Sequence, residues 1–247
     1  MRQLNHDPVA HRQLSFLTLL SLAWILACGP GSETVPPAPA SPPAEPAPEA
    51  GGDATAPTAT VEEVKAFFAD QGKTVLTFTG FSGSGYEDHE AMLAAAGEVL
   101  DRHDPQTTLV NIGATIDGIG AVYELAKTRG FTTTGVVSTQ AREYDATVSP
   151  HVDHVFFIED ATWGGLLEGT DQLSPTSQAM VECGDVFVSL GGGAVSRDEL
   201  VAARALGKEV EYIAADMNHQ KAIDKAARKD QPAPTDFQGP VHAVFGG

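Results

Sequence analysis

The sequence predicts an α/β fold in which helices cover both faces of a doubly wound, mainly parallel sheet. Three observations lead to this prediction. Short apolar runs recur between Thr74 and Ala214, amphipathic segments separate them, and glycines stand where many of the runs end. Near-continuous apolar runs are typical of parallel strands that are buried on both faces. Their alternation with helices predicts three layers, with the sheet in the middle.

The expected elements follow one another at short intervals. We expect six strands, at residues 74–80, 107–113, 132–138, 154–159, 185–190 and 209–214. Apolar residues at helical spacing predict helices at 89–103, 118–130, 175–183 and 197–206. Ser174 and Pro175 suit the cap and first turn of the third helix. We expect the tail from 230 to be irregular, with VHAVF as an optional edge strand.

The first 60 residues do not resemble a folded domain. An apolar run at 14–27 has the length of a secretory signal core and is short for a membrane span. It ends on Ile25-Leu26-Ala27-Cys28, which resembles a bacterial lipobox and predicts lipidation of Cys28. The alternative is an ordinary secretory signal with a chance cysteine.

Residues 28–60 are rich in Pro and Ala and predict a disordered tether. We therefore divide the chain into a signal peptide at 1–27, a lipidated tether at 28–60 and one domain at 61–247. This division predicts a lipid anchor in a bacterial cell envelope, on the periplasmic or outer face.

Charge and composition exclude some partners. The formal net charge of −18 predicts repulsion of nucleic acid, but it leaves room for a small anionic ligand held by a few aimed donors. His151, Asp153 and His154 lie close together in the sequence without a further cluster to complete a metal site, so we expect no metal and no cofactor. Cys183, in an apolar stretch, is expected to be a buried small residue rather than a nucleophile.

Three glycine-containing loops follow predicted strands, where doubly wound sheets bind ligands. Backbone amides of such loops approach phosphate closely. The predicted ligand-binding residues are Gly80, Ser82 and Gly83 in the first loop, Gly113, Thr115, Asp117 and Gly118 in the second, and Gly191, Gly192, Gly193 and Ser196 in the third. Each loop alone is also compatible with a tight turn. Asp117 could bind a ribose hydroxyl or simply belong to a turn. Trp163 could stack on a base or pack in the core.

Three stretches resemble the Rossmann-like superfamily of LOG-type, or lysine-decarboxylase-like, phosphoribohydrolases. They are VLTFTGFSGSG, LVNIGATIDGIGAVYELAKTRGFTTTGVV and DVFVSLGGGAVSRDELVAARALGKEV, which together span most of residues 73–218. The resemblance implies a Rossmann-like sheet, a nucleoside monophosphate or related ribotide among the loops, and a homodimer. Glu199 matches the glutamate that ends the PGGxGTxxE motif of the family, which makes it the implied catalytic residue.

The sequence departs from the family at two positions that matter for catalysis. The family arginine on the preceding helix corresponds to Thr176, and Val195 replaces a motif glycine. Arg197 could bind a phosphate or simply be exposed to solvent at the start of its helix. The leading hypothesis is therefore a lipid-anchored protein that binds a nucleotide-derived or phosphosugar ligand with little hydrolase activity. A hydrolase that uses Glu199 and a non-catalytic structural or interaction protein of the envelope are the alternatives.

Overall fold

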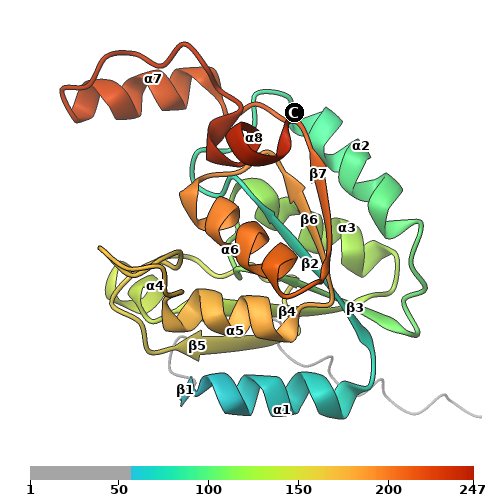
Figure 1. Cartoon of the computed structure of the whole chain (residues 1–247). Helices are drawn as coiled ribbons and strands as arrows, with labels where there is room; N and C mark the ends of the chain where they lie inside the picture. Colours follow the sequence, from blue (N-terminus) through green and yellow to red (C-terminus); the bar gives the residue numbers. More distant parts are fainter. Residues whose placement is uncertain (1–56) are drawn as a thin grey trace, which may run out of the picture. The chain divides into compact units, whose positions relative to one another are not determined.

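The protein folds around a seven-stranded parallel sheet (Figure 1). The computed structural model describes residues 57–247. The strand order is β1-β5-β4-β3-β2-β6-β7, and every neighbouring pair is parallel. The strands are β1 (Thr58–Ala59), β2 (Thr74–Gly80), β3 (Thr108–Ile112), β4 (Thr132–Ser138), β5 (His154–Ile158), β6 (Val186–Leu190) and β7 (Glu209–Ile213). The order reverses at β2, as doubly wound sheets require.

Helices cover both faces of this sheet, which confirms the predicted three-layer class. They are α1 (Val61–Gln71), α2 (His89–Leu100), α3 (Val122–Thr128), α4 (Gln140–Glu143), α5 (Pro175–Cys183), α6 (Ala194–Ala205), α7 (His219–Arg228) and α8 (Gly239–Phe245), with a short 3-10 helix η1 (Gly118–Ala121). On one face, α2 and α3 pack through Met92 and Tyr123 onto strand residues such as Phe78. On the other, α1 and α5 pack through Val64 and Met180.

All six predicted strands are present, and each matches its predicted range to within one residue at either end. Helix α6 begins three residues earlier than expected, at Ala194, directly after the glycines of the third loop. The helix predicted at 118–130 is divided into η1 and α3. Cys183 is buried among apolar side chains, and burial raises the pKa of its thiol to about 12, which agrees with the expected structural role.

The folded domain includes residues before the boundary that we expected for the tether. Thr58 and Ala59 pair with Phe157 and Ile158 of β5. Thr60 then caps α1, because its hydroxyl accepts from the Glu63 amide and the Glu63 carboxylate accepts from the Thr60 amide. Residues 58–60 therefore belong to the fold. Residues 1–56, with the predicted signal peptide, Cys28 and most of the tether, lie outside the described residues.

Two C-terminal helices were absent from the sequence prediction. Helix α7 projects away from the sheet (Figure 1), with only Ala222 and Ala226 buried. The VHAVF segment forms helix α8 rather than an edge strand, and Val241 is its fully buried anchor. Among residues 57–247, no helix has both the length and the apolar character needed to cross a bilayer. The same residues contain no group of three or more His, Cys, Asp and Glu side chains arranged to hold a metal ion.

Candidate functional site

A cavity of about 290 Å³ opens at the carboxyl ends of β2, β3 and β4. The first loop, the second loop and the N-terminal turns of α5 and α6 form its walls. The lining residues are Phe78, Thr79, Gly80, Ser82, Ile112, Gly113, Ala114, Thr115, Ile119, Val136, Val137, Ser138, Ala141, Ala146, Thr147, Val148, Trp163, Thr176, Met180, Val195, Ser196 and Glu199. The parallel sheet thus brings all three predicted loops to one edge.

The predicted site residues divide into three groups in the structure. Those that line the cavity are Gly80, Ser82, Gly113, Thr115, Ser196 and Glu199. Gly83 lines a neighbouring hollow, and the remaining predicted residues, Asp117, Gly118, Gly191, Gly192 and Gly193, line neither. Asp117 is exposed, and its carboxylate makes no cap bond at the start of η1.

The fold itself requires several of these glycines. Gly191 has a φ of 60°, and a side chain there would meet the ring of Phe81 and the carbonyl of Ala215. Gly118 has a φ of 58°, and a side chain there would meet the carbonyls of Phe81 and Ser82. Left-handed backbone without room for a side chain selects glycine for structural reasons. These two positions therefore do not by themselves indicate a ligand.

Helix α8 covers part of the third loop. The Val241 amide donates to the Gly192 carbonyl at 3.4 Å, and a side chain on Gly192 would meet Val241. Both Gly191 and Gly192 are buried. The C-terminal segment, which we expected to be irregular, thus packs on the glycine motif and leaves the first turn of α6 to face the cavity.

Helix α6 contributes its open N-terminus to the cavity wall. No side chain of the described residues caps this helix at Gly193, so the first amides remain available to an anion. Val195 and Ser196 in this turn line the cavity. The Ser196 hydroxyl belongs to a buried side chain, donates to the Gly80 carbonyl at 3.2 Å and joins α6 to the end of β2.

Glu199 lies one turn further along α6 and is the only ionisable residue that the described chain contributes to the cavity wall. Its side chain is almost fully buried, and its Oε1 accepts a hydrogen bond of 2.7 Å from the Ser177 hydroxyl. That hydroxyl in turn accepts from the Gly165 amide at 2.7 Å. Burial raises the pKa of Glu199 to about 7, the Ser177 hydrogen bond opposes the rise, and the nearby Asp198 charge adds to it.

The N-terminus of α5 forms the facing wall. Asp160, although buried, accepts from the Thr176 amide at 3.0 Å and from the Thr162 amide and hydroxyl at 2.8 Å each. Burial alone would raise the pKa of Asp160, but the hydrogen bonds and the helix terminus keep it lowered. The Thr176 hydroxyl is itself buried and has no hydrogen-bond partner among the described residues.

The floor of the cavity contains an unusual backbone conformation. Ala114, directly after Gly113, has a φ of 56° and is 1% exposed. Its amide donates to the Tyr123 hydroxyl, which donates to the Thr134 carbonyl. Left-handed residues other than glycine are uncommon, and they gather at functional sites when the surrounding structure holds them. The buried Tyr123 hydroxyl provides that support here.

Two aromatic side chains stand at the rim. Trp163 lines the cavity and is 52% exposed, and Tyr144 lies beside it with a ring-centroid distance of 5.9 Å. Trp163 is therefore not a core residue, which was the alternative from the sequence. Exposed aromatic rings at the mouth of a cavity suit stacking on a planar ligand group.

Arg197 does not reach the cavity. Its guanidinium donates to Asp198 Oδ1 at 2.6 Å and 2.9 Å, while Asp198 Oδ2 accepts from the Leu166 amide. The bond from Leu166 joins the 160–174 loop to α6. Nothing in the sequence pointed to Ser177 or Asp160 as site residues, because the bonds from Ser177 to Glu199 and from Thr176 to Asp160 join positions 22 and 16 residues apart.

The comparisons with known proteins give only distant likenesses. No protein-family model and no curated protein matches the sequence. Among solved structures, TM1055 is 22% identical over 56% of this chain and 72% of its own, with a TM-score of 0.41. The Moco carrier protein of Chlamydomonas reinhardtii is 20% identical over 57% of this chain and 76% of its own, with a TM-score of 0.42.

A molybdenum cofactor binding protein from Rippkaea orientalis is 17% identical over 67% of this chain and 91% of its own, with a TM-score of 0.41. At such identities and TM-scores the likenesses add nothing about the ligand of this chain. Membership of the LOG-type superfamily stays a prediction from the sequence.

Proposed function

We propose that the cavity binds a small nucleotide-derived or phosphosugar ligand and does little chemistry on it. The Thr176 hydroxyl, which has no partner in the described chain, carries this proposal. A buried polar group without a partner costs free energy, and nearly all buried polar groups in folded proteins have one. Because Thr176 is a residue of the cavity wall, a ligand that hydrogen-bonds to its hydroxyl would remove that cost.

The rest of the wall suits such a ligand. Ligand sites are mainly apolar and hold a few aimed polar groups, and this cavity follows that pattern. Trp163 and Tyr144 offer stacking surfaces to a ring at the rim. The amides of α6 and the Ser196 turn offer donors to an anionic or hydroxyl-rich part.

Binding is favoured over hydrolysis by the charges of the wall. Cleavage of an N-glycosidic bond develops positive charge on the sugar, which an ionised carboxylate stabilises. Glu199 is the single ionisable group that the described residues place there, and burial keeps about half of it protonated near pH 7. Thr176, where the resembled family carries arginine, supplies no charge.

Hydrolysis remains the second candidate because of the same carboxyl. A carboxyl whose pKa lies near 7 is suited to general acid catalysis. If the protein is a hydrolase, products should accumulate from AMP or ADP-ribose in a time course, and Glu199→Gln should abolish them. Binding without products in the wild type supports the first candidate.

The test of binding compares two threonines on the purified full-length chain. The probes are AMP, ADP-ribose and ribose 5-phosphate, first in a thermal-shift screen and then by calorimetry. For any probe that binds, we expect Thr176→Val to lower the affinity roughly fivefold, because one ordinary hydrogen bond contributes about that much. Thr77→Val is the matched control, because Thr77 also carries a buried hydroxyl without a partner in the described chain but lies outside the cavity wall.

The outcomes of this test are distinct. Equal affinities of both variants and the wild type would contradict the role of Thr176. The absence of binding by all three probes would contradict the proposed ligand class.

We also propose the envelope location and the lipid anchor, which rest on the residues before 57. The support is the apolar run at 14–27 that ends on Cys28. Mass analysis of the mature N-terminus should find a diacylglyceryl-modified Cys28 as the first residue. An unprocessed or unmodified N-terminus would contradict the anchor.

A further inference from the structure

A second hollow, of about 490 Å³, lies beside the main cavity between the first loop and α7. Its lining consists of Ser82, Gly83, Ser84, Lys221, Asp224, Lys225 and Arg228. The four α7 residues stand at 221, 224, 225 and 228, and this pattern of three- and four-residue spacings places them on one face of the helix. Three of them are cations, which makes this hollow basic in a chain whose net charge is −18.

These three cations are not neutralised by the described part of the protein. Other basic residues of the fold, such as Lys65, Lys127 and Arg129, form ion pairs with nearby carboxylates. Lys221, Lys225 and Arg228 form no ion pair within residues 57–247 and are exposed. The one carboxylate of the hollow, Asp224, accepts instead from the Gln220 amide group at 2.8 Å.

The first loop, which faces the cations of α7 across the hollow, resembles an anion-binding turn. Gly85 closes it with a φ of 62°, and the Gly85 amide donates a hydrogen bond of 2.9 Å to the Ser82 carbonyl. The Lys221 ammonium lies 3.5 Å from the position that a side chain on Gly85 would occupy. Apart from Gly83 itself and its two chain neighbours, no heavy atom of the described residues lies within 4 Å of the corresponding position at Gly83, which faces open space. Serine hydroxyls and ammonium groups together can surround a phosphate with charged and neutral donors.

Ser82 lines both the main cavity and the basic hollow, which makes the two spaces neighbours. Within the described residues, the main cavity wall contains no cation, whereas the hollow contains three. We propose that the basic hollow is an anion subsite that binds the phosphoryl groups of a small ligand whose uncharged part occupies the main cavity. This assignment of the two parts rests on the proposed function. The hollow itself, as a phosphate site, does not.

Inorganic pyrophosphate tests the hollow alone. We expect calorimetry at low ionic strength to show binding to the full-length protein, and the Lys221→Gln, Lys225→Gln double variant to weaken it at least about tenfold, because hydrogen bonds between charged groups are among the stronger ones. The matched control is the Lys73→Gln, Lys229→Gln double variant. It removes the same charge from residues outside the lining and should stay within about twofold of the wild type.

Two results would overturn the proposal. Absence of pyrophosphate binding by the wild type would show that the hollow is not a phosphate site. An equal loss in both double variants would show that only the general charge of the surface matters. Circular dichroism should confirm that the substitutions leave the fold intact.

A second measurement tests whether the hollow serves the same ligand as the main cavity. We expect pyrophosphate to compete with ADP-ribose and to leave adenosine binding unchanged, since adenosine has no phosphoryl group. If pyrophosphate binds at Lys221 and Lys225 but neither adenosine nor ADP-ribose binds, the subsite stands and the proposed function fails. If ADP-ribose binds equally well to the wild type and to the Lys221→Gln, Lys225→Gln variant, the shared-ligand assignment fails.

Discussion

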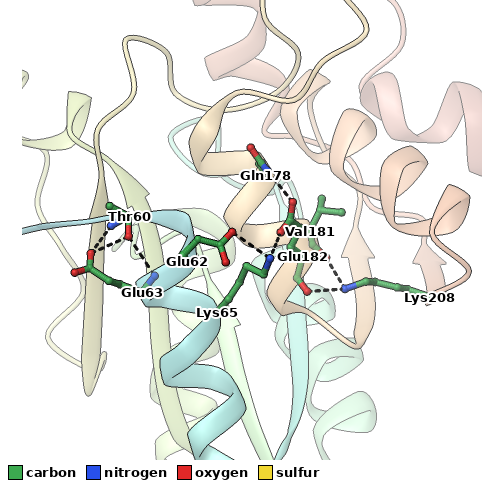
Figure 2. Close-up of polar contacts among 8 residues, drawn as sticks. All are labelled: Thr60, Glu62, Glu63, Lys65, Gln178, Val181, Glu182 and Lys208. Carbon is green, nitrogen blue, oxygen red and sulfur yellow. Dashed lines mark hydrogen bonds and ion pairs between the residues drawn. The ribbon is translucent and has the colours of Figure 1, made fainter.

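The two ends of α5 differ in how their polar groups are satisfied. At the C-terminal end, the Lys208 ammonium donates to the carbonyls of Val181 and Glu182 (Figure 2) and to that of Gly184. At the N-terminal end, the Thr176 hydroxyl has no partner in the described chain, and Ser177 holds a carboxyl whose pKa is raised. We call the C-terminal end the completed end, because the protein itself supplies hydrogen-bond partners there and so stabilises the fold. We call the N-terminal end the incomplete end, because a polar group beside the cavity lacks a partner that a ligand would supply.

The largest expected effect concerns the incomplete end. Glu199 has a folded-state pKa of about 7 against 4.5 in the unfolded chain, so the folded protein retains a proton that the unfolded chain has lost between these values. Its contribution to stability is therefore present below pH 4.5 and is lost as the pH rises to 7. We expect Glu199→Gln to remove this dependence of stability on pH. The variant should have a free energy of unfolding ~3 kcal/mol higher than the wild type at pH 8, with little difference at pH 4.

Urea unfolding at a series of pH values measures this effect. Glu182→Gln is the control, because hydrogen bonds from Lys65 and Gln178 lower the pKa of that partly exposed carboxyl. If the difference in free energy of unfolding between the wild type and Glu199→Gln is the same at every pH of the series, the raised pKa of Glu199 is contradicted.

The completed end should respond in the opposite direction. Lys208→Met removes the donor to three carbonyls at the C-terminus of α5, and we expect the free energy of unfolding to fall by ~2 kcal/mol, because these bonds involve a charged donor. Lys73→Met is the comparison, since Lys73 donates to a single carbonyl of the described chain, that of Pro105, at 3.4 Å. Chemical denaturation of both variants would show whether the three bonds matter. Equal losses would contradict the role assigned to Lys208.

A smaller effect is expected where α1 begins, beside α5. Thr60→Ala removes the side-chain half of the capping box and should lower stability by ~1 kcal/mol. Thr58→Ala, two residues earlier, removes an exposed hydroxyl without a cap and should change stability little. Thermal denaturation distinguishes the two variants, and similar melting temperatures would mean that the cap contributes nothing.

The smallest effect is expected at the surface of the same region. Lys65 forms an ion pair of 2.8 Å with Glu182 across the α1–α5 contact (Figure 2), and both side chains are partly exposed. Water and salt screen such pairs, so Lys65→Ala should cost less than ~1 kcal/mol, and most of that should disappear in about 1 M salt. A loss as large as that of Lys208→Met would contradict the distinction between a screened ion pair and hydrogen bonds to three backbone carbonyls.

Six of the seven strands in residues 57–247 were predictable, because each is a short run bounded by turn residues, whereas the two-residue β1 falls in the segment expected to be the tether. Helix α1 escaped prediction because it follows directly on a Pro- and Ala-rich segment, and its cap at Thr60 reads as part of that segment. Helix α7 has few apolar residues, and α8 is a short apolar segment that is also compatible with a strand. Period alone does not separate a short helix from a short strand.

The candidate site was predictable where it depends on strand ends. Gly80, Gly113 and Ser196 meet at the cavity because parallel strands end at one edge. The basic hollow was not predictable, because Ser82 and Lys221 are brought together only by the path of the chain after β7. The four-residue spacing of Lys221 and Lys225 was a signal, but it has meaning only once the segment is known to be helical.

The pairing of β2 with β6 has a consequence for how the chain is synthesised and folds. Thr79 of β2 and Ser189 of β6 are 110 positions apart and share a hydrogen bond of 3.0 Å between their hydroxyls. Until β6 emerges from the ribosome, one side of β2 is an unpaired edge, which favours association with other chains. Such long-range pairings also form slowly. We therefore expect the nascent chain to need protection by chaperones until its last third is made.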